Sequence, residues 1–181
     1  MNRILRPRRL RDLVADRSGL SAIEFALVLP IMVALYLGGT ELSHMMTVDR
    51  KVTAAASAVG DLVAQTTVVN RNEMDNIYDA AGMILSPYDT ASLTMVVSSV
   101  EVTDRGDKVQ WSDALHKSPR ARNSEVSLPE GVRIEGTTLI LAEVEYTYTP
   151  TLGSSLTDPL LLRDTFYMRP RVTDAVCWDR C

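Results

Sequence analysis

The sequence predicts an α+β protein in which one long hydrophobic N-terminal helix continues into a small head with an antiparallel sheet. Residues 20–39 carry Glu24 as their one charged side chain, and residues 40–66 repeat apolar side chains at spacings of three and four, as a helix does. Residues 92–112 and 139–148 alternate as strands do. We therefore expect four segments: a basic leader (1–19), a transmembrane helix (20–39), an amphipathic helical extension (40–66) and an α+β head (67–181).

The hydrophobic segment 20–39 is long enough to cross a bilayer. At about 1.5 Å per residue it spans roughly 30 Å, the thickness of a hydrocarbon core. Six arginines precede it within residues 1–19, whereas Arg50 and Lys51 are the basic residues on its other flank. By the positive-inside rule the N-terminus stays in the cytoplasm, and the head lies on the opposite side of the membrane.

The formal net charge of -4 hides an asymmetry between the two sides. Residues 1–19 carry a side-chain charge of +4, while residues 40–181 hold thirteen basic and twenty acidic side chains, a net charge of -7. An acidic body disfavours contact with a phosphate backbone, and no aromatic or glycine-rich recognition pattern accompanies the arginines. We expect no nucleic-acid partner.

Two residues are unusual for a plain anchor. Pro30 removes a helical hydrogen bond near the middle of the span and predicts a kink. Glu24 puts a carboxylate into the hydrophobic segment, where an ionised side chain costs up to about 2.5–3.5 kcal/mol unless it is paired. If the chain is cut after Gly19, the new α-amino group of Leu20 lies at position i-4 on the same helix face and supplies the missing counter-charge.

This arrangement of a basic leader, glycine, four residues, Glu24 and an apolar run resembles the type IV prepilin processing signature. The string RSGLSAIEFALVLPIM, residues 17–32, resembles the N-terminus of the TadE/TadG-like pseudopilins of the tight-adherence (Flp) pilus system. The strings YTYTP and YMRPR near the other end resemble such proteins too. The D-x-S-x-S motif of the larger TadG type is absent, which favours the small TadE-like type.

The resemblance implies a pilin-like fold and a structural role as a minor pseudopilin, with no catalytic residue and no cofactor. It implies that a membrane-embedded prepilin peptidase cuts after Gly19, so that Leu20 becomes the new N-terminus, Glu24 the fifth residue and Phe25 the sixth. The implied partners are that peptidase, other pilins or pseudopilins, the inner-membrane assembly platform and the lipid bilayer. The implied location is the bacterial inner membrane, with a periplasmic head.

Two alternatives remain open at the level of the sequence. In the first, Gly19 is never cut and the chain is a signal-anchored periplasmic binding or sensor domain. In the second, a secretory peptidase cuts after the apolar run, near Gly38–Thr40 or within residues 54–58, where small residues gather.

The head should contain a second helix, a hairpin and further strands. We expect the helix at 72–85, capped by Asn70 or Asn72 and stopped by Pro87. A hairpin should turn around Gly106, followed by a surface loop at 115–136, a central strand at 139–148 and a last strand at 165–171. The extension should bury one helical stripe, made of Met45, Val48, Val52, Ala55, Val59 and Leu62.

Candidate chemical groups are few. His44 and His116 show no metal-ligand spacing with each other or with the cysteines, and Ser112, Asp113 and His116 lack a nucleophile-elbow pattern. We expect no metal site and no catalysis. The triplet Arg105-Gly106-Asp107 fits a turn better than an adhesion ligand. Cys177 and Cys181 are four residues apart, a spacing that permits a small disulfide loop, with free thiols or an intermolecular bond as alternatives.

Overall fold

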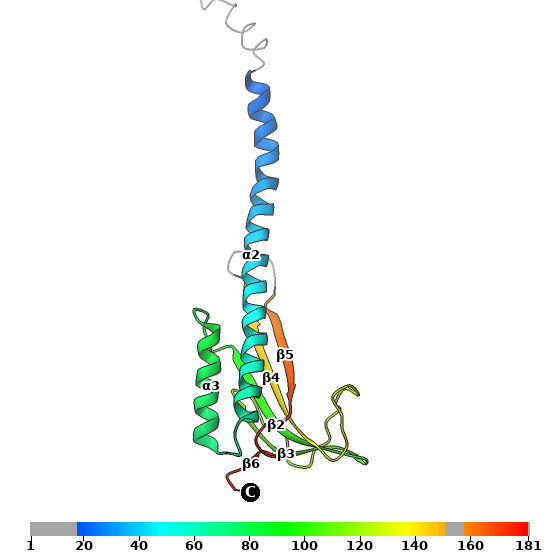
Figure 1. Ribbon diagram of the computed structural model, residues 1–181. Helices are drawn as coiled ribbons and strands as arrows, with labels where there is room; N and C mark the ends of the chain where they lie inside the picture. The colour runs from blue at the N-terminus through cyan, green and yellow to red at the C-terminus, as the bar shows by residue number, and fades with distance from the viewer. Residues whose placement is uncertain (1–17, 151–157, 181) are drawn as a thin grey trace, which may run out of the picture. The chain divides into compact units, whose positions relative to one another are not determined.

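A long helix and an antiparallel sheet make up the fold (Figure 1). The computed structural model describes residues 18–150 and 158–180. Helix α2 (Ser18–Ala64) is 47 residues long and contains Pro30. Contacts divide the chain after Ser43 into two units, and α2 supplies residues to both. The sheet lies in the second unit, and the predicted α+β fold with a long apolar N-terminal helix is confirmed.

The head contains a four-stranded antiparallel sheet in the order β3-β2-β4-β5. Its strands are β2 (Leu93–Thr103), β3 (Gly106–Leu115), β4 (Thr138–Tyr148) and β5 (Leu160–Met168). A separate parallel pair joins β1 (Val68–Val69) to β6 (Cys177–Trp178). The prediction of a central strand at 139–148 is confirmed by β4. The last strand begins earlier than predicted, because its first residues are a continuous apolar run without the alternation that marks a strand.

The inner face of the sheet packs on the second part of α2 and on α3 (Arg71–Leu85). Val48, Val52 and Val59 of α2 are fully or almost fully buried there, as predicted. Leu62 was expected in the same stripe, but it is 39 % exposed, and Val63 is buried in its place. An α-helix drifts relative to a strict alternation of three and four, so the buried stripe moves round the helix toward its end.

The capping residues of helix α3 determine where it begins and ends. The side chain of Asn70 accepts a hydrogen bond from the backbone N–H of Glu73, so Asn70 and not Asn72 is the N-cap. Helical geometry stops at Leu85, two residues before Pro87. From α2, the Lys51 ammonium donates to the carbonyl oxygen of Ile84 at 2.8 Å, where the end of α3 has carbonyls without helical partners.

A β-bulge in β3 lets one strand serve two cores. The hairpin turns as predicted, with Gly106 at φ 121°, a conformation that favours glycine. Trp111 pairs with Ser99 and Val109 pairs with Val100, which leaves Gln110 as an extra residue. The side-chain alternation therefore reverses at the bulge. Val109 packs on the outer face of the sheet, whereas Trp111 packs on the inner face.

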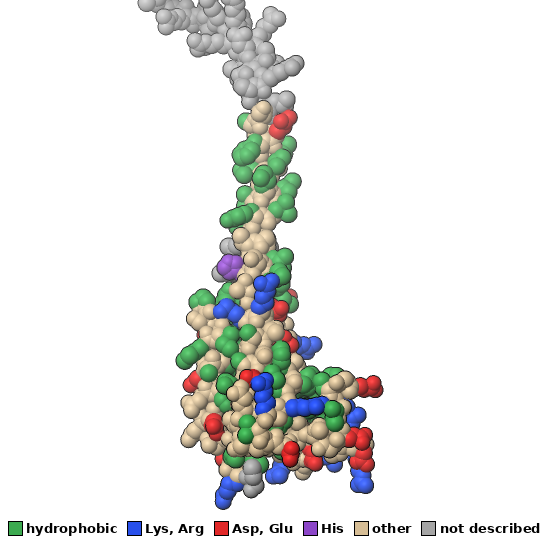
Figure 2. All heavy atoms as spheres, in the orientation of Figure 1, with side chains coloured by type: hydrophobic (Ala, Val, Ile, Leu, Met, Phe, Trp, Pro, Cys, Tyr) green, Lys and Arg blue, Asp and Glu red, His purple; other side chains and the backbone are tan. Residues whose placement is uncertain are grey.

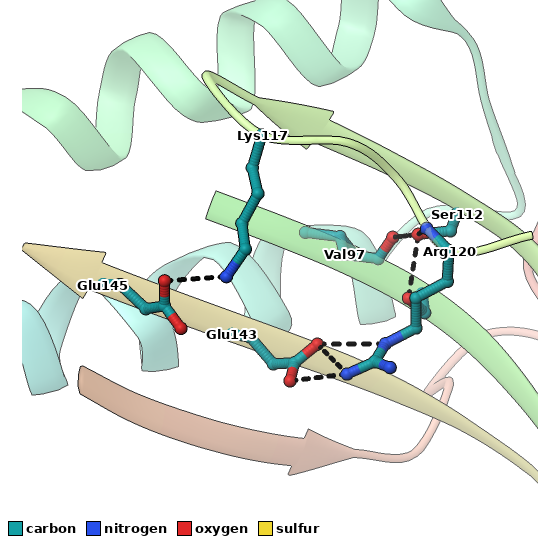
Figure 3. A network of polar contacts seen from close by, with 7 residues as sticks. Val97, Ser112, Lys117, Arg120, Glu143 and Glu145 are labelled. Carbon is teal, nitrogen blue, oxygen red and sulfur yellow. Dashed lines mark hydrogen bonds and ion pairs between the residues drawn. The ribbon is translucent and has the colours of Figure 1, made fainter. Parts of the chain in front are cut away.

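The segment 115–136 is mostly exposed and irregular, as predicted for a surface loop, and a few of its apolar side chains pack on the outer face of the sheet. Its apolar side chains, Val126, Leu128 and Val132, lie against a second small core formed by Val100, Val102, Val109, Leu139 and Leu141. Three ion pairs fix the same segment: Arg120 with Glu143 at 2.7 Å, Lys117 with Glu145 at 2.7 Å and Arg133 with Asp107 at 2.9 Å. Figure 3 shows the first two, with Glu143 and Glu145 extending from β4.

The corrected stripe of α2 can be tested by comparing two adjacent residues. Val63→Ala should lower the free energy of unfolding by about 1–3 kcal/mol, because it removes buried methyl groups and leaves a cavity. Leu62→Ala should change it by no more than about 0.5 kcal/mol, because Leu62 is a partly exposed surface residue. Denaturant titration of the detergent-solubilised chain, followed by tryptophan fluorescence, measures both. Equal losses in the two variants would contradict the assignment of the buried face.

Candidate functional site

The first part of α2 exposes apolar side chains along its length (Figure 2). Every described side chain from Ser21 to Gly38 is exposed. The large ones among them are Ile23, Phe25, Leu27, Val28, Leu29, Ile31, Met32, Val33, Leu35, Tyr36 and Leu37. A helix that is apolar on all sides belongs in a membrane or in the core of a larger structure.

This part of α2 meets the requirements of a membrane span. Among the described residues, α2 from Ser21 onward is the one helix long and apolar enough to cross a bilayer. Such a helix can also be the core helix of a soluble protein, but none of its most apolar stretch is buried in the chain's own fold. Its apolar surface therefore needs a partner from outside, and lipid or other apolar helices fit that need.

The predicted processing residues lie at the start of this helix. Gly19 and Leu20 are in helical backbone, since α2 begins at Ser18. Glu24 and Phe25 are exposed one turn later. Glu24 is at position i+4 from Leu20, so the two positions lie on one face of the helix, as the spacing predicts. An α-amino group created at Leu20 would stand one helical turn from the Glu24 carboxylate.

The structure describes one of the two cysteines, Cys177. Cys177 belongs to β6 and lies opposite Val68 of β1. Cys181 lies outside the described residues, so the predicted disulfide between them stays a prediction.

The residues weighed as catalytic groups have structural partners in the head. Asp113 accepts a hydrogen bond from the Arg71 guanidinium at 2.6 Å. His116 contacts the carbonyl oxygen of Leu93 through Nδ1 at 2.9 Å. The Ser112 hydroxyl donates to the carbonyl oxygen of Val97 at 3.0 Å. Within the described residues, no three His, Cys, Asp or Glu side chains are grouped to hold a metal.

The triplet at the hairpin turn is not presented as an adhesion ligand. Asp107 is 5 % exposed, and the Arg133 guanidinium binds both of its carboxylate oxygens, at 3.1–3.2 Å and 2.9 Å. A carboxylate held in this way is occupied inside the fold.

Sequence reasoning missed how the C-terminal segment holds the end of α2. Arg171 pairs with Asp61 at 2.5 Å, and its backbone N–H donates to the carbonyl oxygen of Ala64 at 2.8 Å. The indole N–H of Trp111 donates to the carbonyl oxygen of Val176 at 2.7 Å, and its ring lies 5.5 Å from that of Trp178. Because these partners lie far apart in the sequence, no short motif or residue spacing reveals the contacts.

The N-terminal helix is also the part of the chain that matches a known family. Residues 19–61 match the model of the TadE-like protein family. The chain carries a TadE-like N-terminal region. The resemblance read from residues 17–32 is thereby confirmed. No curated protein and no solved structure matches the chain.

The TadE-like match covers the whole exposed apolar segment and ends within the buried part of α2. The matched family is one of pilus-associated components, and the apolar helix has the length and composition of a membrane span. The sheet of the head lies beyond the matched residues.

Tyr78 lies almost fully buried beside Asp113. Burial, followed by the negative charge of Asp113, raises the pKa of the Tyr78 phenol above its ordinary value of 10.0. The folded protein therefore keeps this phenol protonated at a pH where the unfolded chain ionises it. Stability from this group is present below pH 10 and is lost as the pH rises above it.

We expect the free energy of unfolding to fall by up to about 1.4 kcal/mol per pH unit above pH 10 on account of Tyr78. Tyr78→Phe should remove this part of the pH dependence and leave a shallower slope. Denaturant titrations of both proteins between pH 8 and about pH 11 measure the difference. Parallel slopes would show that Tyr78 ionises alike in the folded and unfolded chains.

Proposed function

We propose that this protein is a minor pseudopilin, a membrane-anchored structural and assembly component of a tight-adherence (Flp) type IV pilus. It sits in the inner membrane with its leader, residues 1–19, in the cytoplasm and its head, residues 67–181, in the periplasm. A prepilin peptidase cuts it after Gly19. Its partners are other pilins or pseudopilins and the inner-membrane assembly platform, and its role is to be packed beside them.

The exposed apolar helix carries this proposal. Burying one large aliphatic side chain stabilises a structure by about 1.5–3 kcal/mol, and α2 leaves eleven large apolar side chains uncovered between Ile23 and Leu37. A bilayer covers them before assembly. Neighbouring apolar helices cover them in a packed fibre or at its base, so the same surface serves as anchor and as packing element.

Glu24 gives that packing a fixed register. A carboxylate within an apolar helix bundle is stable where a positive group meets it, and a sliding helix would lose the pair. The amine of a processed Leu20, on the same subunit or on a neighbour, is such a group. Cleavage and register are therefore linked in this proposal, since the cut creates the charge that Glu24 needs.

Processing predicts a new N-terminus. The protein extracted from membranes of its native host should begin at Leu20 when the prepilin peptidase is present and at the original N-terminus when it is deleted. N-terminal sequencing of the two preparations measures this. A Gly19→Leu variant should stay uncut in both strains while still inserting in the membrane. An uncut chain in the wild-type strain would contradict processing and favour a signal anchor.

The carboxylate of Glu24 should matter for assembly more than for insertion. Glu24→Leu and Glu24→Gln should both insert normally but lower the recovery of assembled pilus at least tenfold, which corresponds to about 1.4 kcal/mol of lost pairing. Glu24→Asp keeps the charge and should retain most of the function. Membrane fractionation and quantification of sheared pili separate the two effects. If the Glu24→Leu variant assembled pili at the wild-type level, Glu24 would not fix the register of the packed helices.

The alternative of a periplasmic binding or sensor domain would rest on a pocket in the head. One groove of the head has a volume of about 690 Å³ and is lined by arginines, Glu101 and Gln110 beside Trp111 and Trp178. That lining is a mixed polar surface, unlike the mostly apolar lining that is usual for small-molecule pockets. The groove therefore does not favour a binding or sensor domain over the proposed structural role.

A further inference from the structure

One groove of the head brings both tryptophans of the protein next to arginine side chains. It has a volume of about 690 Å³, and its lining comes from residues 99–180, within the second unit of the chain. Trp111 of β3 and Trp178 of β6 line it together with Arg120, Arg122 and Arg180. Figure 1 shows β6 beside β2 and β3, and the Trp111 indole N–H donates to the backbone of the C-terminal segment at 2.7 Å. We call this site the arginine groove.

The floor of the arginine groove is polar where the inner core of the sheet ends. On β2, the inward-facing Leu93, Met95 and Val97 belong to the apolar core, and the next two positions on that face are Ser99 and Glu101. Ser99 is fully buried, and its hydroxyl has no hydrogen-bond partner among the described residues. A buried polar group without a partner is uncommon in a native protein. The floor therefore has hydrogen-bonding capacity that the described part of the fold does not use.

Two of the three arginines of the groove are unpaired within the described residues. Arg120 binds Glu143 of β4 at 2.7 Å, as Figure 3 shows. Arg122 and Arg180 form no ion pair and no side-chain hydrogen bond with another described residue. Glu101, the one acidic residue of the lining, accepts a hydrogen bond from a neighbouring amide instead. The groove thus presents two guanidinium groups that its own residues do not neutralise.

Hydrogen-bonded turns hold the backbone at both of these arginines. Asn123, next to Arg122, has φ 62°, and its N–H donates to the backbone of β3 at 2.8 Å. Asp179, next to Arg180, has φ 59°, and the Arg180 N–H donates to the carbonyl oxygen of Trp178 at 2.7 Å. Asn and Asp are the non-glycine residues that adopt this left-handed conformation most readily. A ligand that binds both arginines therefore has less backbone to order.

We propose that the arginine groove binds an acidic glycan, a chain of sugars in which some rings carry a carboxylate. A guanidinium group binds a carboxylate through two parallel hydrogen bonds, and Arg122 and Arg180 are available for this contact. Trp178 lies half-buried against Trp111, with ring centroids 5.5 Å apart, and offers a flat apolar surface on which the C–H face of a sugar ring packs. The polar floor and Glu101 bind sugar hydroxyls.

The charge of the head disfavours more highly charged anions. Residues 40–181 carry a net charge of -7, and Glu101 lies in the groove itself. A polymer with a charge on every unit, such as a nucleic acid, is repelled by such a surface. A glycan with isolated carboxylates brings few charges, and these meet the arginines directly. An acidic peptide also supplies carboxylates, but it has fewer hydroxyl groups for the polar floor.

The two tryptophans make the test direct, because both line the groove and the sequence has no others. The full chain, in a detergent without a sugar headgroup, is titrated with a hyaluronan hexasaccharide, in which glucuronate alternates with N-acetylglucosamine. One control ligand is the neutral hexamer of N-acetylglucosamine. The other is an end-blocked hexapeptide of alternating aspartate and glycine, which has the same number of carboxylates. We expect a saturable change in tryptophan fluorescence, with about tenfold higher affinity for hyaluronan than for either control.

Two exposed arginines of the groove can be compared with one outside it. Arg122→Gln and Arg180→Gln should each weaken hyaluronan binding about tenfold, because each removes a charge-assisted contact. Arg163→Gln should bind like the wild type, since Arg163 is exposed on β5 and does not line the groove. Thermal denaturation of the three variants checks that each is folded.

Three results would overturn the inference. If hyaluronan gave no saturable change, the groove would not be a glycan site. If the hexapeptide bound as tightly, the ligand would be an acidic peptide. If both groove variants kept the wild-type affinity, the oligosaccharide would bind elsewhere. None of these results bears on the proposed pseudopilin role, because no residue of α2 lines the groove.

Discussion

The fold depends on one helix that must satisfy two environments. From His44 onward α2 buries Val48, Val52 and Val59 against the inner face of the sheet, whereas its earlier part exposes apolar side chains on every side. The helix cannot slide along the sheet, because Gly60 leaves room for β4 and β5 to approach closely and Arg171 binds both Asp61 and the backbone of Ala64. The sheet is thereby fixed to a defined stretch of α2, the part that follows His44.

Features that depend on neighbouring residues could be predicted from the sequence. The long apolar run, the Asn70 cap, the glycine at the hairpin turn and the alternation of β4 each depend on residues within a few positions of one another. The exposed segment of α2 was predicted for the same reason, since its length and its one carboxylate are visible in a single stretch. Glu24 drew attention because a charge in such a segment is costly.

Features that depend on distant partners could not be predicted. Nothing near Gln110 marks it as the extra residue of a bulge, because the register between β2 and β3 is set by which side chains fill the two cores. Likewise, the surface loop at 115–136 could be predicted but its attachment to the sheet could not, because Arg120 and Arg133 pair with carboxylates on strands far along the chain. The exposure of Leu62 was missed because a strict three-and-four alternation does not include the drift of a real helix.

The division between matched and unmatched residues has a physical reason. In the head, the cores need side chains of suitable size and polarity, and many different sequences meet that need. Under the proposed function, residues 19–61 have to suit a lipid bilayer, the peptidase site at Gly19 and neighbouring helices in an assembly, while roughly their last four turns also pack on the sheet. Few sequences meet all of these needs at once. A family model is therefore expected to match the helix to which the proposed function assigns the external contacts, rather than the head.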